Sequence, residues 1–176
     1  MSGEKRKIVL DTSVILNFSE RVATKREDIQ TFLFDKFEVY STPMVIEEAT
    51  RASINILVQS FIQNGIKIIR PDYNKLDFDL FCEMSVTLDE GEVEVITCCM
   101  NSGYASSLDD LAAIKFGRKH GIINFGTIVL LKYAHDNGVI NSPEARVMIS
   151  EMRNNGAYFK DMKDLDFDEY YKKYLK

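Results

Sequence analysis

The sequence predicts an α/β fold in which helices alternate with the strands of a mostly parallel sheet. Short β-rich apolar runs recur along the chain, and most are followed by a longer stretch with apolar residues at helical spacing. Glycine (9) and proline (3) are scarce among the 176 residues, so long elements joined by short loops are expected. This alternation of strands and helices is typical of a parallel sheet.

Five short strands are expected in this sheet. The clearest is the apolar run Ile8–Leu10, which follows the basic segment Lys5–Lys7 and ends at Asp11. The other four are weaker and short. In chain order they are Glu38–Tyr40, Ile66–Ile69, Tyr104–Leu108 and Ile122–Ile123.

Helices are expected in the segments that follow the strands. The first begins after Asp11 and carries Val14, Ile15 and Phe18 at helical spacing. A second begins at Pro43 with Thr42 as its N-cap, and helical spacing continues through Ile62 to a stop at Asn64-Gly65. The remaining helices are expected at Tyr73–Val86, Asp89–Asn101, Asp110–His120, Thr127–Asn137 and Ser142–Asn155.

Composition and charge exclude several classes of protein. A hydrophobic fraction of 45% in 176 residues is enough for one compact core. The formal charge of −5 excludes a broadly basic protein that coats nucleic acid, although it permits a local basic patch. Three cysteines and two histidines without metal-ligand spacing argue against a structural zinc site. With no apolar run near the ~20 residues that span a bilayer and no secretory h-region, a soluble cytoplasmic protein without membrane contact is expected.

Two acidic residues follow directly on predicted strands. Asp11 ends the first strand and Asp109 ends the fourth. In open α/β sheets ligands bind beyond the carboxyl ends of the strands, so both side chains are expected in that crevice. The alternative is that each residue only caps the next helix, a common use of aspartate. Asp110, which begins a helix, is the better candidate for capping or for supporting the site.

A helical wheel identifies two glutamates in addition to these aspartates. In the helix that begins near Asp89, Glu92 lies in the middle of the apolar face, while Glu90 and Glu94 lie opposite. A carboxylate among apolar neighbours is costly unless it is paired or bound to a metal. In the helix that begins at Pro43, Glu48 lies on the flank of the apolar stripe and Glu47 projects away from it. The alternative for Glu47 and Glu48 is that both are exposed surface glutamates, which the helix dipole favours in a first turn.

The four carboxylates of Asp11, Glu48, Glu92 and Asp109 could converge at one edge of the sheet. We call these residues the acidic quartet. Anions packed together would raise one another's pKa values and destabilise the fold unless a cation joined them. Ligands made only of oxygen suit a hard cation such as Mg²⁺ or Mn²⁺.

At this point the sequence resembles the PIN-domain family of metal-dependent ribonucleases, in particular a stand-alone and mostly prokaryotic branch. The resemblance spans about residues 7–156. It is carried by the order and spacing of five stretches, which are IVLDTSVIL, TPMVIEEA, LDEGEVEVI, SLDDLAA and GIINFGTIVLLKYAHDNGVI.

The resemblance implies a three-layer α/β/α sandwich whose acids lie in a pocket at the carboxyl edge of the sheet. It further implies an endoribonuclease that hydrolyses RNA phosphodiester bonds with Mg²⁺ or Mn²⁺. Asp11, Glu48, Glu92 and Asp109 match the acids of the family, and Asp11, Glu92 and Asp109 are the expected metal ligands. Ser13 matches a supporting polar site, and Thr127 is expected to approach the pocket. Domain bounds of 1–156 for the nuclease and 157–176 for a tail or docked helix are expected.

The resemblance is incomplete at one position, and it does not determine which protein partners the chain has. Ile114 stands where related sequences often carry an arginine, which puts in doubt a phosphate-binding cation there. Candidate cations for the RNA backbone are therefore sought elsewhere, among Lys115, Arg118, Lys119 and Lys132. A toxin with an antitoxin partner, and a homodimer formed through residues 139–155, are further expectations.

Other phosphate-handling folds fit the sequence less well. A haloacid-dehalogenase-type enzyme needs a second aspartate where Ser13 stands, and no nucleotide-binding glycine motif is present. A response-regulator receiver needs acids before the first strand closes, together with a later lysine strand. The alternative that stays open is a catalytically weak PIN-like module that binds RNA or protein.

Overall fold

The computed structural model describes residues 4–53 and 55–159, and its sheet is fully parallel. The four strands lie in the order β3-β2-β1-β4. Their bounds are β1 (Arg6–Leu10), β2 (Phe37–Ser41), β3 (Lys67–Ile68) and β4 (Ala105–Ser107). Ile8, Val9 and Leu10 are completely buried, as expected for a central parallel strand with both faces covered.

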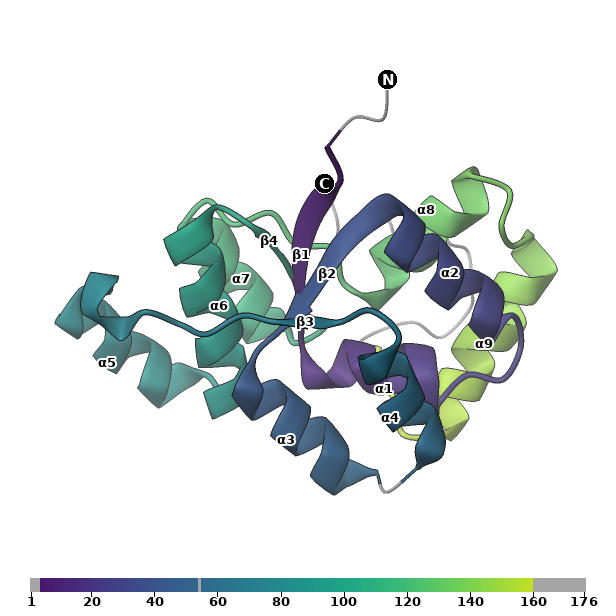
Figure 1. Cartoon of the computed structure of the whole chain (residues 1–176), viewed down its shortest axis with the longest axis horizontal. Helices are drawn as coiled ribbons and strands as arrows, with labels where there is room; N and C mark the ends of the chain where they lie inside the picture. The colour runs from purple at the N-terminus through teal and green to yellow at the C-terminus, as the bar shows by residue number, and fades with distance from the viewer. Residues whose placement is uncertain (1–3, 54, 160–176) are drawn as a thin grey trace.

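Helices cover both faces of the sheet and its carboxyl edge (Figure 1). In Figure 1, α6 and α7 lie on one side of the sheet and α2 and α8 on the other, which gives the expected three-layer α/β/α sandwich. The helices are α1 (Thr12–Ser19), α2 (Arg26–Lys36), α3 (Pro43–Ala52), α4 (Ile56–Gln63), α5 (Phe78–Thr87), α6 (Glu90–Ser102), α7 (Leu111–Lys119), α8 (Thr127–Asp136) and α9 (Ser142–Asn154).

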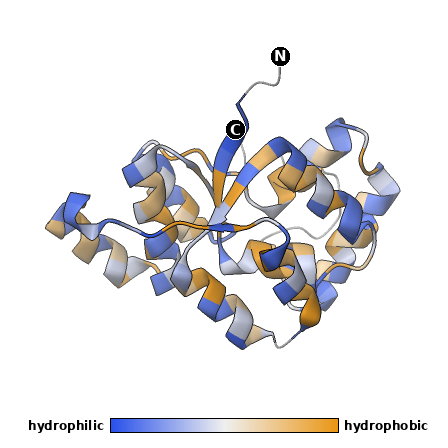
Figure 2. Ribbon diagram, viewed as in Figure 1, coloured by the Kyte–Doolittle hydropathy of each residue, from blue (hydrophilic) through white to orange (hydrophobic). Residues whose placement is uncertain are grey.

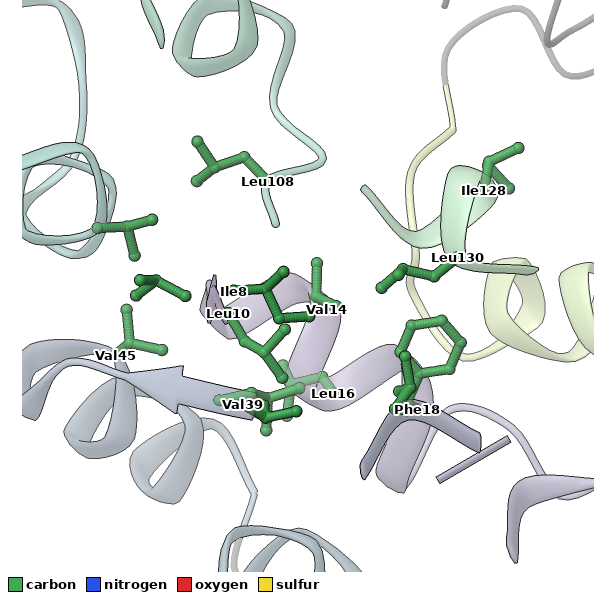
Figure 3. Packing of buried hydrophobic residues seen from close by; sticks show 14 of the residues in the cluster. Ile8, Leu10, Val14, Leu16, Phe18, Val39, Val45, Leu108, Ile128 and Leu130 are labelled. Atoms are coloured by element: carbon green, nitrogen blue, oxygen red, sulfur yellow. The ribbon is translucent and has the colours of Figure 1, made fainter. Parts of the chain in front are cut away.

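The hydrophobic core lies between the sheet and the inner faces of these helices. Hydrophilic and hydrophobic residues alternate along most helices in Figure 2, because one face of each helix is buried. Figure 3 shows β1 residues Ile8 and Leu10 in a cluster with Val14 of α1, Val39 of β2 and Leu130 of α8. The core therefore holds the carboxyl end of β1 and the start of α1, where Asp11 lies, in a fixed position.

The predicted fifth strand at Ile122–Ile123 was wrong. Ser106 and Asn124 form only an isolated parallel bridge beside β4. Two backbone hydrogen bonds accompany it, from Ser106 N to Ile123 O (2.9 Å) and from Phe125 N to Ser106 O (2.8 Å). The segment thus runs beside β4 but is too short for a strand, because α8 begins at Thr127.

The single helix predicted from Pro43 to Ile62 is divided into α3 and α4. Thr42 caps α3 as expected, with its side chain accepting from Val45 N. The helix ends at Ser53, whose backbone is extended, and Asn55 caps α4 by accepting from Leu57 N at 3.0 Å. Serine and asparagine side chains compete for backbone hydrogen bonds, which explains the break.

The other predicted elements differ less from the structure, and one helix, α2, was not predicted. The helix predicted from Tyr73 is a short 3₁₀ turn followed by α5, which begins after its N-cap Asp77. No element was predicted for α2, which buries only Ile29, Phe32 and Leu33 along eleven residues. The remaining predicted helices and strands agree with the structure to within about two residues at each end.

Helix α9 and the segment after it include residues predicted to form a homodimer surface and a tail or docked helix. The apolar face of α9 packs into the protein's own core through Ala145, Met148, Ile149 and Met152. Of the predicted tail, residues 160–176 lie outside the described residues, and Phe159 is buried. No helix within the described ranges is long and apolar enough to cross a membrane.

Candidate active site

A cavity of about 790 Å³ opens at the carboxyl edge of the sheet. It lies where the neighbouring strands β1 and β4 end, and Asp11 N donates to Ser107 O at 3.0 Å. Six carboxylates line the cavity, four of which form the acidic quartet. They belong to Asp11, Glu48, Asp89, Glu92, Asp109 and Asp110.

Asp11 follows β1 directly and is the N-cap of α1. Its Oδ2 accepts from the Ser13 hydroxyl (2.8 Å) and from Ser13 N (3.3 Å), so Ser13 holds the side chain as expected. The residue is only 7% exposed. Burial raises the pKa of Asp11 to about 6, against the lowering effect of the Ser13 hydrogen bond. Asp11 therefore both caps a helix and faces the cavity, so the two readings of this residue do not exclude one another.

Asp109 is held by three donors from two other elements. Its Oδ1 accepts from Thr127 N (2.7 Å), and its Oδ2 accepts from the Thr127 hydroxyl (2.6 Å) and from Asn17 Nδ2 (3.0 Å). Burial raises the pKa of Asp109, and these hydrogen bonds oppose that rise. Asn17 in α1 and Thr127 in α8 thus fix the orientation of this carboxylate, and Thr127 approaches the pocket as expected.

Gly126 permits this close approach of α8 to Asp109. A Cβ atom on Gly126 would lie 2.6 Å from the carbonyl oxygen of Leu108 and 2.8 Å from Asp109 Oδ1. The carbonyl belongs to the backbone and cannot move aside easily. We expect Gly126→Ala to lower the free energy of unfolding by about 1–3 kcal/mol, measured by urea denaturation.

Gly117→Ala is the matched control for this substitution. Gly117 lies within α7, and its added Cβ would meet nothing closer than Ile122 Cβ at 3.6 Å. Alanine there should leave stability unchanged or raise it by up to about 1 kcal/mol, because glycine is a poor helix former. Equal effects of the two substitutions would contradict the structural role given to Gly126.

Glu48 reaches the cavity from α3. Its Oε2 accepts from the Thr12 hydroxyl at 2.6 Å, which ties α3 to the start of α1. The same oxygen lies 2.6 Å from the position that a Cβ atom on Gly91 would take, so the carboxylate rests against the first turn of α6. Glu47 instead points outward and pairs with Arg51. Of the two neighbouring glutamates, only Glu48 lines the cavity.

Glu92 is buried in the first turn of α6, on the apolar face where the helical wheel put it. Its side chain accepts from Asp89 N at 3.3 Å, and its own N donates to Asp89 Oδ1 at 2.9 Å, which completes a capping box. Burial, followed by the charges of Asp89 and Asp11, raises the pKa of Glu92 to about 8. One backbone hydrogen bond does not compensate for its desolvation, so Glu92 carries its charge at a cost.

The other acids that the sequence set aside have structural partners or lie in solvent. Asp110 accepts from Ala112 N (2.7 Å) and Ala113 N (3.1 Å) and is the N-cap of α7, as expected. Glu94 accepts from Met44 N at 3.0 Å, and Glu90 is exposed. Asp110 still borders the cavity, so its charge contributes to the negative potential there.

The chemistry of these donors fits a hard divalent cation. All of them are oxygen ligands, and no carboxylate of the quartet forms an ion pair with a described lysine or arginine. The raised pKa values of Asp11 and Glu92 reflect this lack of compensation. Within the described ranges, however, no three acidic, histidine or cysteine side chains converge closely enough to hold a metal as they stand. Binding would require some of these side chains to rotate inward.

Cations line the same cavity. One stripe of α7 faces it, formed at helical spacing by Leu111, Ile114, Lys115 and Arg118. Lys115 and Arg118 are exposed, and neither forms an ion pair with a described carboxylate. Of the other two candidate cations, Lys119 pairs with Glu83 at 3.0 Å and Lys132 pairs with Asp136. The structure therefore brings two of the four to the cavity.

Three residues of the site were not identified from the sequence. Asp89 could have been found, because an aspartate three positions before Glu92 is a capping-box pattern. Asn17 is buried in α1 beside apolar residues, and a buried amide in such a helix is itself a signal. Arg21 follows the end of α1, and no sequence pattern marked it as part of the site.

Comparison with known proteins identifies the family of this chain. A search of curated proteins found no match for the chain. A protein-family model described as a PIN domain matches residues 7–163. Because this match extends over most of the chain, the protein belongs to the PIN-domain family, whose members are in general nucleases that use divalent metal ions.

Proposed function

We propose that this protein is a divalent-metal-dependent endoribonuclease that hydrolyses RNA phosphodiester bonds with Mg²⁺ or Mn²⁺. The proposal rests on one observation, which is that the acidic quartet and exposed cations line the same cavity. Negative groups suited to a metal thus lie beside positive groups suited to a phosphate backbone. Membership of a family of nucleases supports the same reaction class.

Each acid of the quartet has a role in this proposal. Asp11, Glu92 and Asp109 are the metal ligands, and Asp11 and Asp109 are already oriented by Ser13 and Thr127. Glu48, tied to Thr12, orients the attacking water from the α3 side. A bound divalent ion would supply a lowered water pKa and stabilisation of the leaving oxygen.

The RNA backbone is proposed to cross the stripe of α7. Lys115 and Arg118 project from one face of this helix without ion-pair partners among the described residues, so they are available to phosphates. The half-buried Ile114 precedes both cations on the same stripe, where an apolar side chain can contact a sugar or base. Lys119 and Lys132 are no longer proposed as phosphate contacts, because each already pairs with an acid.

The proposal predicts metal-dependent cleavage of RNA. The purified protein is incubated with a panel of labelled RNAs in Mn²⁺ or Mg²⁺, and products are separated on a denaturing gel. EDTA should abolish cleavage because the carboxylates cannot activate water alone, and added Mn²⁺ should restore it. Cleavage that is equally fast in EDTA would contradict the metal-dependent mechanism.

The same assay addresses the alternative that the chain is a catalytically weak module. Such a module would bind RNA or protein but give no metal-dependent products. A role as the toxin of a toxin–antitoxin pair, an antitoxin partner and a homodimer stay predictions from the resemblance.

A further inference from the structure

Arg21 is held at the edge of the cavity by its backbone. It lies two residues beyond α1, and its N–H donates to Leu16 O at 3.0 Å. Its carbonyl oxygen accepts from Asn155 Nδ2, also at 3.0 Å, which joins it to the segment that follows α9. The backbone of Arg21 is thus fixed from two sides, and its partly buried side chain lines the cavity.

The guanidinium of Arg21 is connected to Asp109 through Asn17. Arg21 Nη1 donates to Asn17 Oδ1 at 3.2 Å, and Asn17 Nδ2 donates in turn to Asp109 Oδ2 at 3.0 Å. The asparagine amide stands between the two charges, so Arg21 does not form an ion pair with Asp109. The positive group therefore lies near the quartet, where its charge opposes the rise in the pKa of Asp109 without an ion pair between the two side chains.

Most of the hydrogen-bonding capacity of Arg21 is unused. Among the described residues, its Nη2 has no hydrogen-bond partner and no carboxylate lies within ion-pair distance of the guanidinium. The Cβ position of Gly156 lies 4.0 Å from Nη2, so Gly156 itself places no side chain against this nitrogen. A partly buried cation with free donors is costly unless an anion from outside the chain completes its contacts.

A guanidinium matches the geometry of a phosphate, because two parallel N–H groups can bind two oxygens. Lys115 and Arg118 are exposed, whereas Arg21 is partly buried and its guanidinium is oriented by Asn17. We propose that Arg21 binds a phosphate of the RNA inside the cavity next to Asp109, with Asn17 as its positioning residue. This inference rests on the proposed ribonuclease function and adds a substrate-binding residue to it.

The test compares RNA binding by variants of the full chain that share Asp11→Asn, which prevents turnover. A fluorescein-labelled single-stranded 12-mer RNA is titrated at several salt concentrations and followed by anisotropy. Arg21→Gln should weaken affinity about tenfold and reduce the log–log salt slope by about 0.7, the value for one lost phosphate contact on a single strand. Arg21→Lys should keep the salt slope and lose part of the affinity, because a lysine keeps the charge without the fork.

Arg51→Gln is the matched control. Arg51 is an exposed arginine on α3 that pairs with Glu47 and does not line the cavity, and its substitution changes the net charge equally. If the affinity and salt slope fall as much in this variant as in Arg21→Gln, the effect is one of overall charge and the inference is wrong. An unchanged salt slope in a folded Arg21→Gln variant also overturns it.

A second measurement remains informative if Arg21→Gln does not fold. A neutral methylphosphonate is moved along the 12-mer, one phosphate at a time. At one position the methylphosphonate should lower the RNA affinity of the protein with Arg21 much more than that of Arg21→Lys. Equal losses of affinity in the two proteins at every position would reject the contact. A protein with Arg21 and Asp11 intact that neither binds nor cleaves RNA would reject the ribonuclease proposal as well, whereas normal cleavage without this coupling would reject only the role of Arg21.

Discussion

Asp11→Asn is expected to lower metal-dependent RNA cleavage by a hundredfold or more, since a lost metal ligand removes several kcal/mol of transition-state stabilisation. The fold should survive, because asparagine is as good an N-cap as aspartate and can still accept from Ser13 N. Loss of cleavage would then arise from chemistry alone. Initial rates on the best RNA of the panel, at saturating Mn²⁺, measure the effect.

Asp35→Asn is the control for this substitution. Asp35 is an exposed aspartate on α2 that does not line the cavity, so its variant should cleave at the wild-type rate. Circular dichroism melting curves of both variants check that each is folded. If Asp11→Asn cleaves as fast as Asp35→Asn, Asp11 is not a ligand, and the quartet loses its most buried aspartate.

The predicted site residues that line the cavity have positions that follow from elements that the core dictates. Asp11 and Asp109 follow strands whose carboxyl ends are buried, so the direction in which the chain leaves the sheet is fixed by packing. Glu48 and Glu92 lie on helices with clear apolar faces, and their orientation follows from helical geometry. This reasoning places side chains around one cavity, but it does not determine how closely their oxygens approach.

Two of the residues that escaped prediction, Asn17 and Arg21, depend on contacts between distant parts of the chain. Asn17 and Thr127 are 110 residues apart in sequence and meet at Asp109. Arg21 is held at the cavity by Leu16 of α1 and by the segment that follows α9. Such contacts leave no periodic pattern, and a buried amide such as Asn17 is the only local sign that a polar network surrounds it.

The secondary structure differs from expectation where local hydrogen bonding outweighs hydrophobic spacing. Ile56 and Phe61 continue the spacing of α3, but the Ser53 and Asn55 side chains bind backbone groups and divide the helix. Similarly, β-branched residues at 122–123 predicted a strand, whereas Asn124 bonds Leu108 N and Leu108 O through its side chain. Asn124 thus takes the place of further ladder bonds next to β4 and anchors the chain just before Gly126.

The cost of the buried carboxylates predicts an unusual dependence of stability on pH. The pKa of Glu92 is raised in the folded protein from 4.5 to about 8, and that of Asp11 from 3.8 to about 6. For each residue, at pH values between its unfolded and its folded pKa, the folded state binds more protons than the unfolded state. The free energy of unfolding therefore falls as pH rises through that range. For Glu92, the fall between pH 5 and pH 9 should be roughly 4 kcal/mol in the metal-free protein.

Glu92→Gln should remove most of this dependence. Glutamine retains an oxygen for the capping box with Asp89 N, but it has no charge to bury. Urea denaturation in EDTA at pH 5, 7 and 9 should therefore give a much flatter profile for this variant than for the wild type. Glu90→Gln, an exposed neighbour on the same helix, should keep the wild-type profile. Parallel profiles for wild type and Glu92→Gln would show that Glu92 is not the group responsible.

The same carboxylates predict how a metal should change this profile. A divalent ion binds the ionised quartet and not the unfolded chain, so it stabilises the fold by mass action, by about 2.7 kcal/mol at a hundredfold excess over Kd. Because protons compete for the same oxygens, Mn²⁺ should raise the melting temperature more at pH 8 than at pH 5. The increase should be smaller in Glu92→Gln, which has lost one ligand. If the metal effect is equal at both pH values, the ion binds elsewhere, since only groups that titrate in this range can couple metal binding to pH.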